Sequence, residues 1–538
     1  MKHRIYKILC TVLSAALVLS LFAGCTSGSN NNSNNSSQAQ ENATQVIIAM
    51  STGSEPEAGF NPIINWGAGE HMHEPLIQST LFTTNTDMSF ENDLATSYES
   101  SADGLTWTFT VRDDVKFTDG EPLTAHDVAF TFNEIMTNPA SEIDLSMVKE
   151  VSAPDDTTFI LKLNKPFNAL LYNIAVIGIV PEHAYSDSYG ENPIGSGRYI
   201  LEQWDKGQQI ILTANPDYYG EAPKMQRVVV VFMDEAAAIA AAQSGQVDMA
   251  ATSAVYSDQT INGFELLACA SVDSRGISLP TTQPGGTRTD GDQTYETGNA
   301  VTSDLAIRQA MNLAVDRQTM IDNVLNGYGS VAYSVSDGMP WASENLIVSM
   351  DREKAVKILE DAGWVLGSDG IRVKDGVRAS ITVMHSASDT VRQGLAAEFS
   401  NQMKEIGIEI ITKGASWDEI YPASFTTPVL WGWGSNSPIE LYQLYYSSGG
   451  GNFTGYESKI IDENFDQALA QLDIEDSYQY WQTGSEEVGT EGAATWVWFA
   501  NVDHLFFKDV NLNVAEQKLH PHGHGWAIVN NVDQWTWS

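Results

Sequence analysis

The first 25 residues constrain where this chain can fold more than any other stretch. A basic start precedes an apolar run from Ile8 to Ala23. The run is shorter than the roughly 20 residues that a membrane-spanning helix needs. A basic start, a short apolar run and small residues at a cleavage site are typical of a secretory signal peptide. We therefore predict a signal peptide at residues 1–24, and we expect the remaining chain to fold outside the cytoplasm.

The residues that end this leader also predict a membrane anchor. Ala23 and Gly24 stand directly before Cys25, which resembles the lipobox of bacterial lipoproteins, although Phe22 is larger than the usual aliphatic residue. The resemblance implies cleavage before Cys25 and lipid attachment to its thiol. Residues 25–44 would form a lipidated flexible tether, because so polar a sequence cannot bury enough surface to fold. The alternative is an uncleaved leader that serves as the anchor. Both place the protein at the cell membrane, facing the cell surface or the periplasm.

The charge and the cysteines limit the possible partners and chemistry. Residues 1–24 contribute three cations and no acids to the formal charge of −41, so the remaining chain carries −41 − 3 = −44. Binding to nucleic acid relies on Lys and Arg, and we expect no nucleic-acid partner. Cys269 is the one cysteine outside the leader and its lipidation site. It lies in an apolar run and is expected to be a buried, unreactive thiol.

The chain is too long for one hydrophobic core, and its pattern alternates between strands and helices. Thr124, with Asp127 three residues later, predicts a capped helix start. Residues 280–303 are rich in Gly, Thr and Asp and are predicted to form a loop. This alternation favours an α/β fold. The predicted elements are a strand at 46–50, a hairpin of 95–100 and 106–111, a helix at 125–136, a strand at 159–163, helices at 354–363 and 391–407, and a strand at 408–411.

Five sequence blocks together resemble one known family. Residues 117–132 follow the pattern F-x-D-G-x-P-x-T-A-x-D-V-x-F-x-F, and residues 306–317 contain R-Q-A followed by A-x-D-R. Between them, in order, come Asn-Pro-Ile-Gly-Ser-Gly at 192–197, Asn-Pro-Asp-Tyr-Tyr at 215–219 and Gly-Gln-Val-Asp at 245–248. This series resembles the oligopeptide- and nickel-type extracellular solute-binding proteins of ABC importers, family 5, and the similarity covers residues 45–538.

The resemblance implies a two-lobed, periplasmic-binding-protein-like fold of type II, in its three-subdomain oligopeptide-binding class. The two lobes would be joined by two chain crossings, near residues 275 and 497, and would close on a ligand. The protein would act as a monomer and deliver its ligand to the membrane subunits of an ABC permease. The implied divisions are lobe I at 45–82, 191–275 and 498–538, an inserted subdomain at 83–190, and lobe II at 276–497.

The 306–317 block also predicts a scaffold residue. Ala306, Ala310 and Ala314 recur at helical spacing as a core face. Arg308 lies off that stripe, and we expect it to be a salt-bridge partner in the scaffold rather than a ligand contact.

The stretch from Val429 to Pro438 is the strongest candidate for a ligand site. Trp431 and Trp433 are each followed by glycine, and a tryptophan in a cleft offers flat apolar area with an N–H donor. The alternative is that both tryptophans fill a core. The stretch resembles the family's ligand loop, which in peptide-binding members carries an aspartate for the peptide ammonium group. Ser435 and Asn436 occupy that place here, so a neutral ligand or a chelate fits better than an ammonium group.

The opposite wall of the cleft would come from residues that follow the first strand. We predict ligand contacts from Phe60, Asn61, Trp66, Glu70 and His71. His71 and His73 are two residues apart and could together bind nickel, copper or zinc. The alternative is that these histidines are ordinary polar loop residues.

A second group of histidines lies near the C-terminus. His520, His522 and His524 alternate with other residues, and three imidazoles at this spacing could chelate a transition metal. Alternatively, they decorate a surface turn.

The sequence contains no motif of a common enzyme class. It lacks a G-x-S-x-G elbow, a Walker loop, H-E-x-x-H and a G-x-G-x-x-G after a strand. We therefore expect a substrate-binding lipoprotein of an ABC importer, without turnover and without a cofactor, whose ligand is a small peptide-like solute or a transition-metal chelate. The alternatives are a nickel-type metal receptor of the same fold and a secreted hydrolase.

Overall fold

The computed structural model describes most of the chain that follows the predicted tether. The described residues are 43–56, 59–64, 76–85, 87–141, 143–290, 293–520 and 527–538. Within them, no helix has both the length and the apolarity needed to cross a membrane. The signal peptide, Cys25 and almost all of the predicted tether lie outside the described residues.

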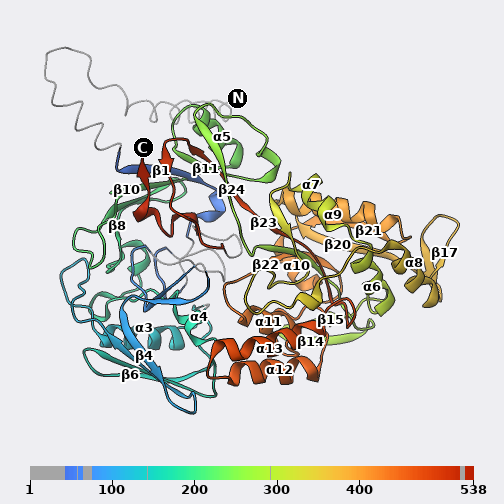
Figure 1. Cartoon of the computed structure of the whole chain (residues 1–538), viewed down its shortest axis with the longest axis horizontal. Helices are drawn as coiled ribbons and strands as arrows, with labels where there is room; N and C mark the ends of the chain where they lie inside the picture. The colour runs from blue at the N-terminus through green and yellow to red at the C-terminus, as the bar shows by residue number, and fades with distance from the viewer. Residues whose placement is uncertain are drawn as a thin grey trace, which may run out of the picture. The chain divides into compact units, whose positions relative to one another are not determined.

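A seven-stranded sheet contains both the first long strand and one of the last (Figure 1). Its edge-to-edge order is β12-β24-β11-β1-β10-β9-β8, and β1 runs parallel to both β10 and β11. The predicted strand at 46–50 is confirmed as β1. Helix α5 (Glu235–Gln243) packs against one face, which explains why the central strands are nearly continuous apolar runs. The bounds are β1 Gln45–Met50, β8 Tyr199–Asp205, β9 Gln209–Ala214, β10 Arg227–Phe232, β11 Met249–Thr252, β12 Phe264–Cys269 and β24 His504–Asp509.

A six-stranded sheet, in the order β16-β23-β13-β22-β20-β21, is covered on both faces. Side chains of α6, α7 and α9 form the core on one face, and those of α10 to α13 contribute to the core on the other. The strands are β13 Ser274–Ser278, β16 Gly329–Val331, β20 Ser380–Ser386, β21 Glu409–Ala415, β22 Val429–Trp433 and β23 Trp496–Val502. The helices are α6 Leu305–Ala314, α7 Arg317–Val324, α9 Thr390–Lys404, α10 Trp417–Ala423, α11 Ile439–Tyr445, α12 Lys459–Ala470 and α13 Ile474–Glu486.

A four-stranded antiparallel sheet, β4-β5-β7-β6, forms the third large sheet, and α3 packs against it (Figure 1). The predicted hairpin is confirmed as β4 and β5. The predicted cap is also confirmed: the Thr124 N–H donates to Asp127 Oδ2 at 2.9 Å, and a capping box begins α3. The bounds are β4 Ala95–Ser100, β5 Thr106–Val111, β6 Val148–Asp155, β7 Thr158–Leu163, α3 Ala125–Thr137 and α4 Leu170–Ile174.

The remaining described elements are short strands, short 3-10 helices and one α-helix. The predicted helix at 354–363 is confirmed as α8, which begins two residues earlier than expected. The bounds are β2 Phe82–Thr84, β3 Phe90–Asn92, β14 Gly286–Asp290, β15 Gln293–Thr297, β17 Val365–Leu366, β18 Arg372–Lys374, β19 Val377–Arg378, β25 Leu512–Asn513, β26 Thr536–Trp537 and α8 Arg352–Asp361.

Two predictions about local structure were wrong. The stretch 280–303 is not a loop throughout, because β14 and β15 pair within it as an antiparallel hairpin. Arg288 anchors the hairpin by donating to the carbonyl oxygens of Asn452 and Gly449 at 2.6 and 2.9 Å. Arg308 is a buried scaffold residue, as expected, but it forms no salt bridge with any residue that the structure describes: it donates to the backbone carbonyls of 302, 303 and 493.

The chain passes between the seven-stranded and six-stranded sheets at two places. Residues 270–273 connect β12 to β13, and Asp503 alone connects β23 to β24. Strand β23 continues to Val502, so the second passage comes later in the chain than the crossing expected near 497. The two passages run side by side, since the Val502 N–H donates to the Asp273 carbonyl at 2.9 Å.

The Gly-Gln-Val-Asp block has a structural role in the first sheet. Asp248 accepts a hydrogen bond from the Ile47 N–H at 2.7 Å, and its backbone carbonyl accepts from the Asp509 N–H at 2.8 Å. Burial raises the pKa of Asp248 to about 6, Asp509 adds a smaller rise, and the bond from Ile47 opposes both. Asp248, directly before β11, therefore links to β1 through its carboxylate and to β24 through its backbone carbonyl, and the buried carboxylate has an electrostatic cost.

Because of this cost, the difference in free energy of unfolding between Asp248→Asn and the wild type should depend on pH. The pKa of Asp248 is higher in the folded state, so its stabilising contribution is complete below about pH 4 and is lost as the pH rises through about 6. At pH 7 the variant should unfold with a free energy about 1 kcal/mol higher than the wild type, after allowance for solvent screening, and at pH 4 the two should agree. Chemical denaturation at both pH values measures this. Asp113→Asn, at an exposed position, is the control, and a pH-independent difference would contradict the assignment.

Candidate ligand-binding cleft

The two tryptophans of the predicted ligand stretch have different environments. Trp431 is 2% exposed, and its indole N–H donates to Ser278 Oγ at 2.9 Å. Its ring stacks on Phe453 at 4.5 Å and on Trp417 at 5.6 Å between centroids. All of its surface and its polar atom are therefore used inside the protein.

Trp433 is half-buried and keeps an unused donor. Its carbonyl oxygen accepts a hydrogen bond from Ser274 Oγ at 2.7 Å. Its indole Nε1 is buried and has no hydrogen-bond partner in the described structure. A buried N–H without a partner costs about 1–3 kcal/mol, so this atom is a candidate to meet an acceptor on a ligand.

The residues after Trp433 form a tight turn against the first passage. Gly434 has φ of 143°, and a Cβ on it would lie 1.8 Å from the Val272 carbonyl oxygen. Ser435 Oγ donates to the Ser437 carbonyl at 3.2 Å. Asn436 Nδ2 reaches the Leu519 carbonyl at 3.5 Å, while its Oδ1 is buried and has no partner in the described part of the chain. The glycine after Trp433 therefore allows two backbone segments to approach closely.

Phe60 and Asn61, predicted on the opposite wall, make internal contacts. Phe60 is 1% exposed, with its ring edge-on to Trp204 at 5.8 Å. Asn61 Nδ2 donates to the Tyr185 hydroxyl at 3.1 Å, and its Oδ1 accepts from the Ile63 N–H at 3.1 Å. Their side chains stabilise the loop after β1 in this structure.

Most of the candidate metal ligands lie outside the described residues. These are His71, His73, His522 and His524, together with the predicted ligand contacts Trp66 and Glu70. His520 is buried, and its Nε2 lies 3.1 Å from Gln517 Oε1. Among the residues that the structure describes, no group of three or more His, Cys, Asp or Glu side chains could hold a metal ion.

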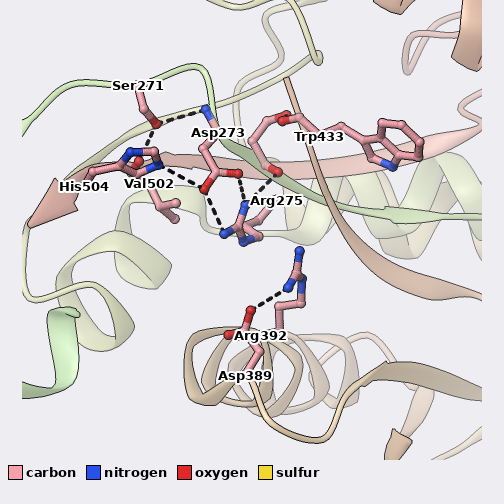
Figure 2. Close-up of polar contacts among 9 residues, drawn as sticks. Ser271, Asp273, Arg275, Asp389, Arg392, Trp433, Val502 and His504 are labelled. Atoms are coloured by element: carbon pink, nitrogen blue, oxygen red, sulfur yellow. Dashed lines mark hydrogen bonds and ion pairs between the residues drawn. The ribbon is translucent and has the colours of Figure 1, made fainter. Parts of the chain in front are cut away.

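The two passages carry a buried network of charges that sequence reasoning missed (Figure 2). Asp273, 2% exposed, binds Arg275 through both carboxylate oxygens, and the Arg275 Nη2–Asp273 Oδ2 distance is 3.0 Å. His504 Nε2 lies 3.4 Å from the same Oδ2. Burial acts to lower the pKa of Arg275, but Asp273 outweighs it and the pKa lies above its ordinary value. The sequence did contain an indication of this pair: Asp273 and Arg275 are two residues apart, and side chains at that spacing in an extended chain point to the same side.

A second ion pair lies beside the first. Asp389, the N-cap of α9, accepts from the Arg392 N–H at 2.8 Å and from Arg392 Nη1 at 2.6 Å. Burial and the neighbouring Arg275 lower the pKa of Arg392 to about 10. Each of the two arginines is therefore held by its own aspartate.

The charged network and Trp433 lie on opposite faces of the six-stranded sheet. Ser274 pairs with Trp433 across the strands, so both side chains share one face. Arg275, the next residue, projects to the other face, where α9 packs. Figure 2 shows the Trp433 ring turned away from the two arginines.

A cavity of about 280 Å³ lies on the charged side of the passages. Its lining comes from both sheets: the residues after β1 and β11, the strand β13, the N-terminus of α9 and the second passage. The lining residues are Met50, Ser51, Ser54, Ala251, Thr252, Ser253, Ala254, Asp273, Arg275, Leu325, Tyr328, Asp389, Val391, Val502, Asp503, His504, Leu505, Phe506 and Ile528. A mostly apolar cavity with a few polar groups is the usual form of a small-molecule site.

Removing the carboxylate at the passages should destabilise the fold. Asp273→Ala leaves the Arg275 charge buried without its partner, and the free energy of unfolding should fall by about 3–5 kcal/mol. Asp114→Ala, which breaks an ion pair with Arg112 at a largely exposed aspartate, should cost less than about 1 kcal/mol. Chemical denaturation compares them, and losses of equal size would refute a structural role for the buried pair.

Gly434→Ala tests the close approach after Trp433. The added Cβ must displace the Val272 backbone, so we expect a loss of at least about 2 kcal/mol. Gly120→Ala is the matched control, because Gly120 also has a positive φ but nothing within 4 Å of an added Cβ. It should cost about 1 kcal/mol. If the two variants unfold at the same denaturant concentration, crowding at Gly434 is not important.

Comparison with known proteins places the chain in a family. Residues 89–455 match the bacterial extracellular solute-binding proteins, family 5. Protein XP55 of Streptomyces lividans is 33% identical over 482 residues, which cover 86% of this chain and 84% of that protein. The oligopeptide-binding protein AppA of Bacillus subtilis is 26% identical and covers 97% of this chain and 98% of its own length.

A solved structure shares the fold. NikZ from Campylobacter jejuni, in complex with Ni(L-His), superposes with a TM-score of 0.75 and 25% identity, covering 92% of this chain and 99% of NikZ. This likeness confirms the type II periplasmic-binding-protein-like α/β fold expected from the sequence. The chain belongs to the bacterial extracellular solute-binding proteins of family 5, which bind solutes outside the cytoplasm.

Proposed function

We propose that this protein captures a small solute between its two large sheets and delivers it to the membrane subunits of an ABC importer. The observation that carries the proposal is the cavity of about 280 Å³, which is lined from both sheets. Several lining residues follow the carboxyl ends of β1 and β11, and ligands of open α/β sheets bind outside such ends. The protein acts as a monomer held at the membrane by lipid on Cys25.

Contacts far from the passages support closure of the protein around its ligand. The Asn168 N–H donates to the Leu469 carbonyl at 3.1 Å, and the Tyr172 ring lies edge-on to Trp341 at 5.7 Å. In our division, residues 83–190 form the inserted subdomain and residues 276–497 form lobe II. Opening at the two passages would break these contacts, so a ligand that bridges the lobes favours the closed state.

The ligand is a small peptide-like solute or a metal chelate. AppA is named for oligopeptides, and the NikZ structure contains Ni(L-His). Trp433 Nε1 and Asn436 Oδ1 have no partner in the described structure and are a separate contact region, because Trp433 lies on the sheet face opposite the cavity. They offer one donor and one acceptor and no charge, which suits a hydrogen-bonding group such as an amide. Binding of a nickel chelate through His71, His73, His520, His522 or His524 is the second candidate, supported by the likeness to NikZ. We propose no catalysis in either case.

Analysis of the bound solute tests the function. Mass spectrometry of the protein purified from its native host should find a small solute in about equimolar amount. Calorimetry should be carried out with that solute, with short peptides and with Ni–histidine, and at least one of these ligands should bind saturably. X-ray scattering should show that the protein becomes more compact when that ligand binds. The protein should release no product from peptides or glycans. Turnover, or the absence of binding by every class, would reject solute capture.

A further inference from the structure

The two large sheets also meet at a place away from the two passages. Strand β11 of the seven-stranded sheet leads into a 3-10 helix, η4 (Ala254–Tyr256), while α7, which packs on the six-stranded sheet, ends shortly before Asn326. The Asn326 side-chain amide donates through Nδ2 to the Ala254 carbonyl at 2.7 Å and to Ser257 Oγ at 3.2 Å. We call this contact the Asn326 clasp, and it joins the two sheets without a covalent connection.

Both ends of the clasp are held by packing. Ala254 is 5% exposed and belongs to the core that α6 to α9 form on the six-stranded sheet, although its own strand lies in the other sheet. Leu325, directly before Asn326, is buried in the same core. Ser257 is also buried, and its Oγ donates to the Ala254 carbonyl at 2.7 Å. The two acceptors of the clasp are therefore fixed in position before Asn326 reaches them.

The backbone at the end of α7 does not by itself require an asparagine. The Leu325 and Gly327 N–H groups both donate to the Ile321 carbonyl, at 3.0 and 3.1 Å, which is a common way for a helix to end. Asn326 has φ of 50°, a left-handed conformation that asparagine tolerates better than most residues. Glycine would adopt it at still lower cost. The side chain of Asn326 therefore has its use in the clasp.

The neighbours of the clasp form part of the cavity wall. Leu325 and Tyr328, on either side of Asn326 in sequence, line the cavity from the six-stranded sheet, and Ser253 and Ala254 line it from the seven-stranded sheet. Asn326 itself is not among the lining residues. Moving the sheets apart here would break both hydrogen bonds of the clasp and separate the two walls.

We propose that Asn326 is a positioning residue for solute capture: its clasp forms when the sheets close and holds the two walls of the cavity at the separation that the solute needs. This inference rests on the proposed solute capture and adds a residue that acts on affinity through Ala254 and Ser257. Apparent affinity falls with the fraction of the protein in the binding-competent arrangement. Loss of the clasp should therefore weaken every solute of the cavity by a similar factor.

Removal of the side chain without a change of backbone conformation tests the proposal. Asn326→Gly keeps a residue that adopts a positive φ and loses both hydrogen bonds. Calorimetry on the full chain uses trialanine, Ni–histidine and the solute found by mass spectrometry. Each probe that the wild type binds should bind about three- to tenfold more weakly, as expected for the loss of one or two hydrogen bonds. X-ray scattering at saturation should show the compactness of the wild type, because the clasp changes the closed population and not the closed form.

Two further variants separate the clasp from the helix end. Asn326→Asp keeps the size of the side chain and tolerates a positive φ, but it places an acceptor against the Ala254 carbonyl, so it should also weaken binding. Asp375→Gly makes the matched backbone change, because Asp375 also has φ of 50° but is exposed between β18 and β19. It should bind like the wild type. The melting temperatures of the two glycine variants should lie within about 4 °C of the wild type.

The other outcomes decide against the proposal. Wild-type affinity in Asn326→Gly or Asn326→Asp, or an equal loss in Asp375→Gly, overturns the positioning role and leaves solute capture intact. A loss for only one of several bound probes would assign Asn326 to a direct contact with that probe. A larger fall in melting temperature, or a saturated variant less compact than the wild type, would make the clasp a requirement of the fold. If the wild type binds none of the probes, the positioning role and the proposed function fail together.

Discussion

The buried carboxylate of Asp273 is the interaction on which the centre of this protein depends. It binds Arg275 in the adjoining strand β13, its backbone N–H donates to Ser271 Oγ at 2.9 Å, and its carbonyl accepts from the Val502 N–H at 2.9 Å. One residue thus joins the two passages between the sheets. Because strands alternate their side chains, fixing β13 here also decides that Arg275 faces the cavity while Ser274 and Trp433 face the opposite side.

Features that depend on near neighbours could be predicted from the sequence. The hairpin of β4 and β5, the capping box of Thr124 and the strand β1 each involve residues only a few positions apart or a single apolar run. The α/β class followed from the alternation of predicted strands and helices, and the family from the order of the five blocks. The hairpin of β14 and β15 was missed because Gly, Thr and Asp also fit a loop, and the contact that anchors Arg288 lies in a distant segment.

Features of the candidate site that depend on distant partners could not be predicted. Trp431 and Trp433 have the same local sequence pattern, and only the positions of Phe453, Trp417 and Ser278 decide which one is fully packed. Arg308 was expected to pair with an acid, yet backbone carbonyls brought close by the fold bind it. Asp273 and His504 are 231 positions apart in sequence. Such contacts are set by tertiary packing, which local composition does not record.

The acids of the cavity show how pairing separates structural charges from those available to a ligand. Asp273 and Asp389 each hold an arginine that burial would otherwise destabilise, so their charges serve the fold. Asp503 stands at the same passages without such a partner in the described structure. The relevant comparison between relatives is the net charge of the whole cavity after its internal pairs are cancelled.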